Sequence, residues 1–292
     1  MDTSLRLRSQ LLSIERPLVM GILNATPDSF YQGSRTPVTA GAASLVARAR
    51  QLVAEGADLL DIGAVSTRPD VQPASEADEM ARLDAALGPL RDAMPDVPLS
   101  VDTFRASVAR HAVERYGVEM VNDISGCADP EMQSTVAELG VAYVLTHNPS
   151  AMASGVGQPN NCAALVDDDA KVPIDVRVAQ FFARRTSELY AAGVADVILD
   201  PGFGFAKTLD ENYALMRALP RLIGLFPQVP FLIGISRKSM IYRLLGTTPE
   251  DSLNGTTVLN TIALQAGAHI LRVHDVGEAV EAVKIVSHLG RV

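Results

Sequence analysis

Short runs of apolar and β-branched residues recur along the chain, separated by alanine-rich stretches of helical length. The runs are nearly continuous instead of alternating with polar residues, which is typical of strands buried on both faces of a parallel sheet. Eight such strands are predicted, at residues 17–24, 57–64, 98–104, 119–125, 142–148, 196–205, 230–236 and 269–276.

The segments between these runs carry signals of helix ends. Residues 75–78 (Ser-Glu-Ala-Asp) resemble a capping box, and residues 248–251 (Thr-Pro-Glu-Asp) place a cap, a first-turn proline and two acids in order. Apolar side chains recur at helical spacing within 105–116, which gives that helix one apolar face. Three glycines are expected to end helices just before a strand: Gly56, Gly140 and Gly267.

Eight repeats of strand and helix predict an α/β protein, a single (β/α)8 TIM barrel. A doubly wound sheet usually has fewer strands and a glycine-rich phosphate loop after the first strand, and no such loop follows Asn24. The barrel domain is expected at 17–292, with 148–173 as an irregular loop at its mouth. Residues 1–16 form an N-terminal extension to which the sequence assigns no role.

Polar residues fall at the C-terminal ends of these strands, where a barrel core has no need of them. In a barrel such residues converge on one mouth, the place where barrel enzymes do their chemistry. The residues concerned are Asn24, Asp61, Asp102, Asn122, Asp123, His147, Asp200, Ser236, Arg237, Lys238, Arg272, His274 and Asp275.

Taken singly, these residues also have structural interpretations. Asp102 fits the entry to a helix, and Asp200 before Pro-Gly fits a turn. Asp61 and Asp123 are read as groups that brace loops or other side chains, and His147 is either a buried histidine or part of a pocket wall. The basic residues form either a solvated rim or an anion site: Arg237, Lys238, Arg272 and His274.

Composition restricts the class of partner. The chain has 292 residues, 48% of them hydrophobic, and a net charge of −9, which argues against binding to nucleic acid or to an anionic membrane surface. Cys127 and Cys162 have no metal-ligand spacing and are read as reduced thiols. The absence of a long apolar run makes the cytoplasm the expected location.

The strand-end residues suit a particular kind of ligand. An ionised aspartate accepts two parallel N–H bonds from an amino-pyrimidinone edge, so carboxylates and an asparagine in an apolar mouth indicate a flat, nitrogen-rich heterocycle. Arg272 and His274 lie two residues apart on one strand and face the same side. Together they indicate a phosphate or diphosphate on that heterocycle.

Seven motifs then appear in the order found in dihydropteroate synthases, and the similarity extends from about residue 17 to 285. The chain resembles that family of pterin-binding enzymes through residues 20–30 (MGILNATPDSF), 61–63 (DIG) with 66–69 (STRP), 100–103 (SVDT), 122–126 (NDISG), 200–205 (DPGFGF), 236–239 (SRKS) and 272–275 (RVHD).

The resemblance implies condensation of 6-hydroxymethyl-7,8-dihydropterin diphosphate with p-aminobenzoate, with Mg2+ as cofactor, sulfonamides as competitors and a homodimer as the assembly. It implies that the pterin ring is held by Asp102, Asn122, Thr146, Asp200 and Lys238. It places p-aminobenzoate at Thr67, Pro69, Phe205, Lys238 and Ser239. It places the diphosphate at Asn24, Arg68, Arg272 and His274, with Asn24 also binding Mg2+; the residues implied in catalysis are Arg68, Asp102, Lys238, Arg272 and His274.

Several positions depart from the family pattern. Gln32 stands where the first loop usually has an acid, Thr146 where a methionine usually lines the pterin pocket, and Ala206 where a glycine is usual; Val65 and Asp70 also differ. The pterin and anion sites therefore look intact, and the loops for p-aminobenzoate look altered. Two alternatives stay open: a pterin-binding paralogue of weak or no activity, and a barrel that transfers a methyl group from a reduced folate.

Overall fold

A closed parallel barrel forms the centre of the molecule. The computed structural model describes residues 4–7, 10–25, 41–65, 74–149 and 172–290, and in these ranges eight strands form one sheet in the order β8-β7-β6-β5-β4-β3-β10-β9. An isolated parallel bridge between Leu199 and Phe231 joins the two edges, so the barrel prediction is confirmed. The strands are β3 (Leu18–Asn24), β4 (Leu59–Gly63), β5 (Leu99–Asp102), β6 (Met120–Asp123), β7 (Ala142–Thr146), β8 (Val197–Asp200), β9 (Leu232–Ile233) and β10 (Ile270–Val273).

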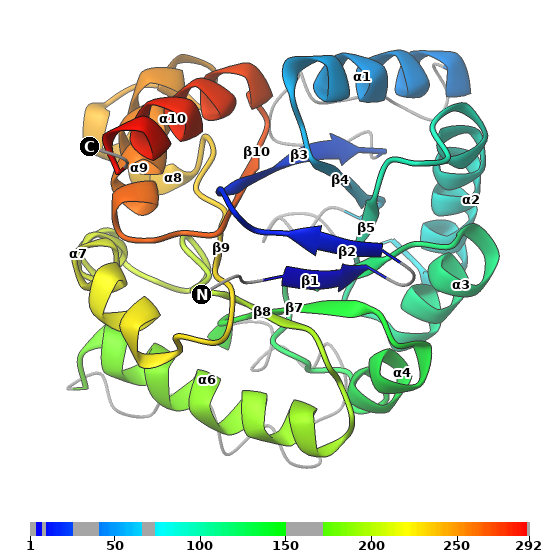
Figure 1. Cartoon of the computed structure of the whole chain (residues 1–292), viewed down its shortest axis with the longest axis horizontal. Helices are drawn as coiled ribbons and strands as arrows, with labels where there is room; N and C mark the ends of the chain where they lie inside the picture. The colour runs from blue at the N-terminus through cyan, green and yellow to red at the C-terminus, as the bar shows by residue number, and fades with distance from the viewer. Residues whose placement is uncertain (1–3, 8–9, 26–40, 66–73, 150–171, 291–292) are drawn as a thin grey trace.

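Helices surround the barrel on all sides (Figure 1). They are α1 (Ala42–Glu55), α2 (Glu76–Ala93), α3 (Ala106–Tyr116), α4 (Met132–Leu139), α6 (Ile174–Ala191), α7 (Leu209–Leu225), α8 (Ser239–Leu245), the 3-10 turn η4 (Glu250–Ser252), α9 (Leu253–Gln265) and α10 (Val276–Leu289). Ser75 caps α2 by accepting the N–H of Asp78 at 3.1 Å, as its motif predicts. Gly56 and Gly140 end α1 and α4 in the left-handed conformation.

The strands are shorter than their apolar runs, and the difference is largest for two of them. The run 196–205 yields only Val197–Asp200, and 230–236 yields only Leu232–Ile233. Pro201 lacks the N–H that would continue the ladder, and Gly202 turns the chain at a φ of 70°. A Cβ at Gly202 would lie 2.1 Å from the carbonyl oxygen of His147, so only glycine permits this turn.

The barrel has two separate apolar regions. One lies between the sheet and the helices and takes the outward residue of each strand, such as Val19, Leu60 and Val101. The other fills the N-terminal half of the barrel interior with Leu18, Met20, Leu59, Met120, Ala142, Val144, Ile198, Leu232 and Ile270. Inward positions nearer the C-terminal ends of the strands are polar, so the barrel interior changes from apolar to polar along its axis.

The N-terminal extension covers one end of the barrel. β1 (Ser4–Leu7) and β2 (Gln10–Ser13) pair as an antiparallel hairpin, which lies across the barrel in Figure 1. Leu5 and Leu7 are buried and pack against the inner apolar residues, and the N–H of Arg6 donates to Asp196 at 3.2 Å. The structure thus assigns to these residues the closure of the N-terminal end.

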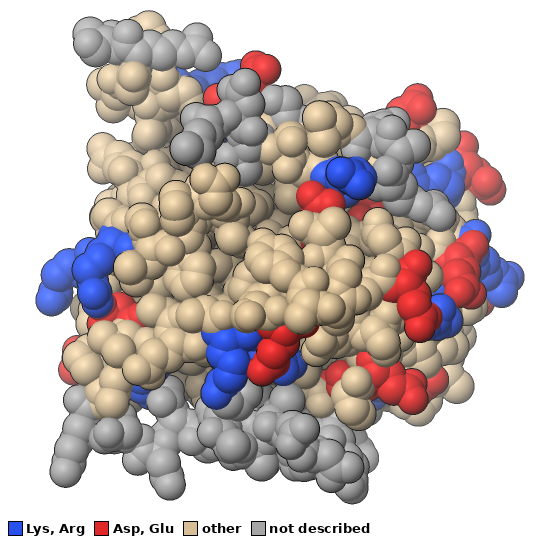
Figure 2. Space-filling model, turned by 60° about the horizontal axis from the view of Figure 1, so that its bottom comes forward, with Lys and Arg blue, Asp and Glu red and all other residues tan. Residues whose placement is uncertain are grey.

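The face of the molecule drawn in Figure 2 carries charges of both signs. Figure 2 shows one face on which Lys and Arg lie next to Asp and Glu instead of collecting in an extended area of one sign. Among the helices that the structure describes, none is long and apolar enough to cross a membrane.

Candidate active site

The strand ends bring polar side chains together inside the mouth. A Cβ on Gly63 would lie 3.0 Å from the amide oxygen of Asn24 and 3.8 Å from the Cβ of Asp102. A Cβ on Gly234 would lie 3.9 Å from a carboxylate oxygen of Asp200. These two glycines keep the interior open between the functional side chains, and Asn24, Asp102 and Asp200 lie in the one mouth as their strand positions predict.

Arg272 links two carboxylates across the barrel. Its Nε donates to Oδ2 of Asp61 at 2.7 Å, and its Nη2 donates to Oδ2 of Asp102 at 2.6 Å. Asp61 is fully buried, as the bracing interpretation expects, whereas the side chain of Asp102 remains 19% exposed. Asp102 is therefore the carboxylate of the pair that a ligand can reach.

These contacts change the protonation of both groups. Burial raises the pKa of Asp102 to about 7; the cation of Arg272 opposes this rise and the charge of Asp61 adds to it. Burial would lower the pKa of Arg272, but Asp61 and Asp102 outweigh it and hold the pKa above its ordinary value. Arg272 thus stays a cation, while Asp102 titrates close to neutral pH.

Several buried polar atoms in the interior have no hydrogen-bond partner among the described residues. Asn122 donates its Nδ2 to Asp61 at 2.8 Å, which leaves its Oδ1 unpaired. The hydroxyls of Ser100 and Thr146, on the neighbouring strands, are also buried and without a partner there. Unpaired buried polar atoms are costly, and several in one place indicate a ligand that completes them.

Asp200 is the last residue of β8, and Lys238 lies after β9 as the N-cap residue of α8. Asp200 accepts the N–H of Gly202 at 2.8 Å, so it braces the turn as well as facing the interior. Lys238 donates to the carbonyl of Phe203 at 2.7 Å, and its Nζ lies 4.4 Å from the ring centroid of Phe205. Burial lowers the pKa of Lys238 to about 8, although Asp200 acts in the opposite direction.

His274 follows β10 and is held by Ser236. Its Nδ1 lies 3.0 Å from the Ser236 hydroxyl, which also accepts the backbone N–H of His274 at 3.2 Å. Burial, reinforced by the cation of Arg272, lowers the pKa of His274 to about 3. At neutral pH it therefore offers a hydrogen bond instead of a charge.

The interpretation of Arg237 as part of an anion site is wrong. Its guanidinium binds both carboxylate oxygens of Asp275, at 2.8 and 2.9 Å, and donates to the carbonyl of Pro249 at 3.0 Å. Its backbone has a φ of 55°, and its N–H donates to Thr256 at 3.0 Å. Arg237 and Asp275 thus fasten the segment after β9 to η4 and the end of β10.

Two other strand-end residues are structural. Asp123 accepts the hydroxyl of Tyr143 at 2.6 Å and the N–H groups of Ser125 and Cys127, so it braces the loop after β6 as expected. His147 is buried, and its ring lies 5.2 Å from that of Phe181 on α6. The ring is therefore buried, as one interpretation expects, but its Nδ1 has no hydrogen-bond partner among the described residues.

Lys207 is a residue that the sequence analysis did not single out. Its Nζ donates to three backbone carbonyls, those of His147 at 3.0 Å, Gly202 at 2.8 Å and Phe205 at 3.2 Å. Burial lowers its pKa to about 7, against the influence of Asp200. Lys207 thus links the loop that carries Phe205 to the end of β7. In the sequence, the only sign of this role is its position beside Thr208, just before α7.

The remaining predicted positions either lie in or next to the loops after β8 and β9 or lie outside the described residues. Phe205 is half-buried in the loop before α7, and Ser239 is the first residue of α8, next to Lys238. Ala206, where the family has glycine, takes a φ of 43°. Five predicted or departing positions lie outside the described residues: Gln32, Thr67, Arg68, Pro69 and Asp70.

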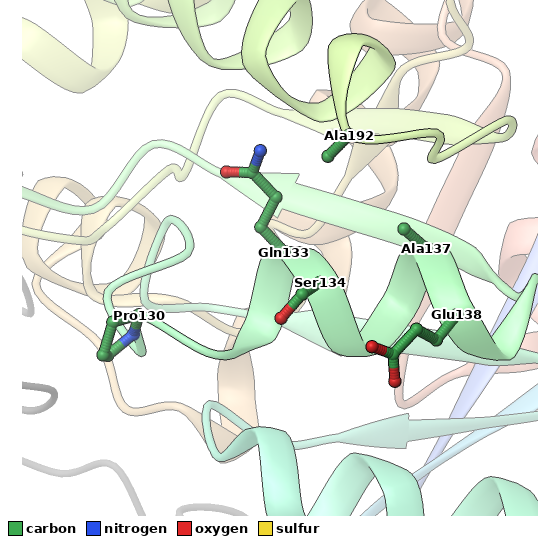
Figure 3. A pocket seen from close by; sticks show the side chains of 6 residues that line it. All are labelled: Pro130, Gln133, Ser134, Ala137, Glu138 and Ala192. Carbon is green, nitrogen blue, oxygen red and sulfur yellow. The ribbon is translucent and has the colours of Figure 1, made fainter.

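An open depression on the outer wall offers no comparable chemistry. It lies between α4 and the end of α6 and is lined by Pro130, Gln133, Ser134, Ala137, Glu138 and Ala192 (Figure 3). The amide of Gln133 is already bonded to the carbonyl of Glu188 at 3.0 Å. The mouth of the barrel is therefore the candidate site.

A closed barrel with polar groups gathered at the carboxyl ends of its strands defines the class of (β/α)8 barrel enzymes. The family model described as pterin binding enzyme matches residues 20–274. The chain belongs to this family, and within it to the dihydropteroate synthases, which are transferases.

Three relatives illustrate the similarity. Dihydropteroate synthase of Escherichia coli (strain K12) is 35% identical over 280 residues, which cover 94% of this chain and 92% of that protein. The structure of Xanthomonas albilineans dihydropteroate synthase with 4-aminobenzoic acid has a TM-score of 0.85 at 35% identity and covers both chains fully. The Yersinia pestis enzyme in complex with a sulfonamide drug has a TM-score of 0.83 at 35% identity and 99% coverage of both chains.

Proposed function

We propose that the protein condenses 6-hydroxymethyl-7,8-dihydropterin diphosphate with p-aminobenzoate, giving 7,8-dihydropteroate and diphosphate in folate biosynthesis. The observation that carries this proposal is the group of unpaired buried polar atoms beside ionisable carboxylates: Oδ1 of Asn122 and the hydroxyls of Ser100 and Thr146. A flat ring with N–H donors and acceptors on its edges would complete them.

The pterin ring would lie between β5, β6, β7 and β8. Asp102 and Asp200 supply carboxylate acceptors for ring N–H and amino groups, and Asn122 supplies an amide oxygen. Thr146, on β7 and opposite Asp200 in the ladder, replaces an apolar contact with a hydroxyl. Lys238 lies at the rim of the same space and interacts electrostatically with Asp200.

The diphosphate would lie at Arg272 and His274. In the described residues the Nη1 of Arg272 has no hydrogen-bond partner, and Nη2 can exchange Asp102 for a phosphate oxygen. His274 adds a neutral hydrogen bond, and bound diphosphate would raise its pKa from about 3. Arg68, which lies outside the described residues, would add a second cation.

Mg2+ fits this arrangement through Asn24. Mg2+ commonly uses one or two protein oxygens together with substrate phosphates and water, and the amide oxygen of Asn24 lies next to Gly63 inside the mouth. Among the described residues, no group of three or more His, Cys, Asp or Glu side chains could hold a metal alone. Bound Mg2+ would neutralise charge on the diphosphate.

In the proposed reaction the bond between the pterin methylene carbon and the diphosphate oxygen breaks, and the amine nitrogen of p-aminobenzoate bonds to that carbon. Diphosphate leaves with the electron pair of the broken C–O bond, and the nitrogen then loses its extra proton to water. Arg272 stabilises the charge that develops on the leaving oxygen. Asp102 and Asp200 favour the cationic character of the pterin, and the amine needs positioning more than a strong base.

The second substrate would bind above the pterin. Phe205 and the methylene stem of Lys238 offer an apolar wall, and Ser239 begins α8 beside them. Thr67 and Pro69 would complete this position from outside the described residues. Because the Yersinia pestis relative was solved with a sulfonamide drug, we expect sulfonamides to compete with p-aminobenzoate here as well.

A homodimer is the expected assembly. Apolar side chains that are 41% to 62% exposed lie on the adjacent helices α9 and α10, namely Val258, Ile262, Ile285 and Leu289. Such side chains suit a contact with a second copy of the chain. Sedimentation or light scattering would measure the state directly; the cytoplasmic location stays a prediction.

The test supplies dihydropterin diphosphate, p-aminobenzoate and Mg2+ to the purified protein and follows dihydropteroate and diphosphate together. We expect equal amounts of both products, and their loss in Asp102→Ala. Gln32→Asp, run in parallel, would turn over faster if the missing acid limits the rate. Binding of the pterin diphosphate without any product would instead indicate the inactive paralogue.

A further inference from the structure

Asp61 is a fully buried carboxylate that contacts two side chains of the site. It lies in the middle of β4, where burial of an unpartnered charge would destabilise the fold. Its Oδ2 accepts both Nε of Arg272, at 2.7 Å, and Nδ2 of Asn122, at 2.8 Å. A single oxygen thus holds one residue of β10 and one of β6.

The contact with Asn122 fixes which way its amide points. An ionised carboxylate only accepts hydrogen bonds, so the amide nitrogen must face Asp61. The amide oxygen of Asn122 is then turned away, buried and without a partner among the described residues. Asp61 therefore makes Asn122 an acceptor for the ring.

Asp61 and Asp102 bind different nitrogen atoms of the Arg272 guanidinium. Asp61 binds Nε, and Asp102 binds Nη2 at 2.6 Å. When a ring takes Asp102 as its acceptor, the bond from Asp61 remains. Arg272 then stays in place with its Nη atoms available to an anion.

We propose that Asp61 is a positioning residue that links the two halves of the site, setting the amide of Asn122 for the pterin ring and holding Arg272 for the diphosphate. This inference rests on the proposed function, because ring and diphosphate are the two parts of that substrate. Asp61 acts through Asn122 and Arg272 by its Oδ2; its other oxygen, Oδ1, is buried without a hydrogen-bond partner among the described residues.

The linkage has a thermodynamic consequence. Binding of the ring at Asp102 releases Nη2 of Arg272 for the diphosphate, and binding of diphosphate draws Nη2 away from Asp102. Each fragment should therefore tighten the binding of the other, by the same factor in both directions. The effect depends on Asp61, since without it Arg272 is free to leave with the anion.

The test is calorimetric titration with 6-hydroxymethylpterin and with inorganic diphosphate plus Mg2+, each alone and each in the presence of the other. In Asp61→Asn a neutral amide replaces the carboxylate. Loss of the charged bonds should weaken each fragment about ten-fold or more and abolish the cooperativity. Asp123→Asn is the matched control, because Asp123 is equally buried on β6 but bonds only to the loop and Tyr143.

A double exchange separates the two roles. Asp61→Asn combined with Asn122→Asp keeps one carboxylate and one amide in contact and still presents an oxygen to the ring. We expect ring affinity to return to within about three-fold of wild type while diphosphate stays weak, since Arg272 again faces a neutral amide. This variant also serves if Asp61→Asn alone does not fold.

The outcomes are distinct. If Asp61→Asn binds both fragments within two-fold of wild type, or if the double exchange binds the ring no better than Asp61→Asn, the positioning role is overturned. A lower melting temperature with unchanged affinities, as expected for Asp123→Asn, would make Asp61 merely structural. A wild-type protein that neither binds dihydropterin diphosphate nor forms dihydropteroate would overturn the proposed function instead.

Discussion

The two ends of the barrel use the same strands and opposite kinds of side chain. At the N-terminal end, inward residues such as Met20 and Met120 pack on one another and on Leu5 and Leu7 of the hairpin. At the C-terminal end, the inward residue of β6 is Asn122, which keeps an unpaired buried atom. The N-terminal end is fully packed without a ligand. The C-terminal end has buried polar atoms that a bound ligand would pair.

The comparison shows how a barrel separates stability from chemistry. Apolar burial at the closed end stabilises the fold in proportion to the area removed from water. The polar mouth contributes less, because charges such as those of Asp61 and Arg272 must first be desolvated. A substitution at the closed end should therefore lower stability alone, whereas one at the mouth should lower turnover and, where it leaves a buried charge without its partner, stability as well.

The largest effect is expected for Arg272→Ala. Turnover should fall at least about 100-fold, because the leaving diphosphate loses its cation. The free energy of unfolding should also fall by about 3–5 kcal/mol, because Asp61 is left buried without its partner. Arg16→Ala is the contrasting variant: its pair with Asp58, at 2.6 Å, is half-exposed, so it should cost at most about 1 kcal/mol and leave turnover unchanged.

Leu5→Ala tests the closed end. Leu5 is 1% exposed, and its truncation should lower the free energy of unfolding by about 2–4 kcal/mol in denaturant titration. Because the hairpin lies at the opposite end from the mouth, kcat should change less than about two-fold, a shift too small to reflect a lost transition-state contact. A large drop in kcat with little loss of stability would contradict the separation of the two ends.

The pH dependence of ring binding tests the mouth. Since the pKa of Asp102 is raised to about 7, its carboxylate is lost as the pH falls through 7. A protonated carboxyl donates where the ring needs an acceptor, so the dissociation constant of a pterin should rise about ten-fold per pH unit below that point. Calorimetry between pH 5.5 and 8.5 measures this, and Asp102→Asn should flatten the profile.

The smallest effect is expected for Ala206→Gly. Ala206 has a φ of 43°, which costs a residue with a Cβ about 1 kcal/mol relative to glycine. Thermal unfolding should therefore show a small gain in stability. Ala214→Gly within α7 should have the opposite sign and a similar size, about 1 kcal/mol; a gain in both would point to a cause other than backbone strain.

Much of the fold could be predicted because barrel strands and helices have local signals. Each of the eight apolar runs contains a strand, and Ser75, Gly56 and Gly140 cap their helices as expected. The strand ends were less predictable. Apolar residues such as Ile235 continue beyond β9 because they pack in the core without pairing.

The site was predictable to the extent that strand position decides it. Alternation along a strand places Arg272, Asp102 and Asn122 inside the barrel whatever surrounds them. Strand alternation does not show which side chains bind one another. Arg237 adjoins Lys238 in the sequence, yet its guanidinium turns to Asp275, because a φ of 55° redirects the chain there.

The sequence by itself determined the barrel, the end at which its polar residues gather and the family to which the chain belongs, since periodicity and motif order are properties of the chain. Only the tertiary structure decided that β1 and β2 cover the N-terminal end, that Lys207 binds three carbonyls and that Asp61 binds both Asn122 and Arg272. The reason is physical: each of these contacts joins segments distant along the chain, and their geometry exists only once the barrel has closed.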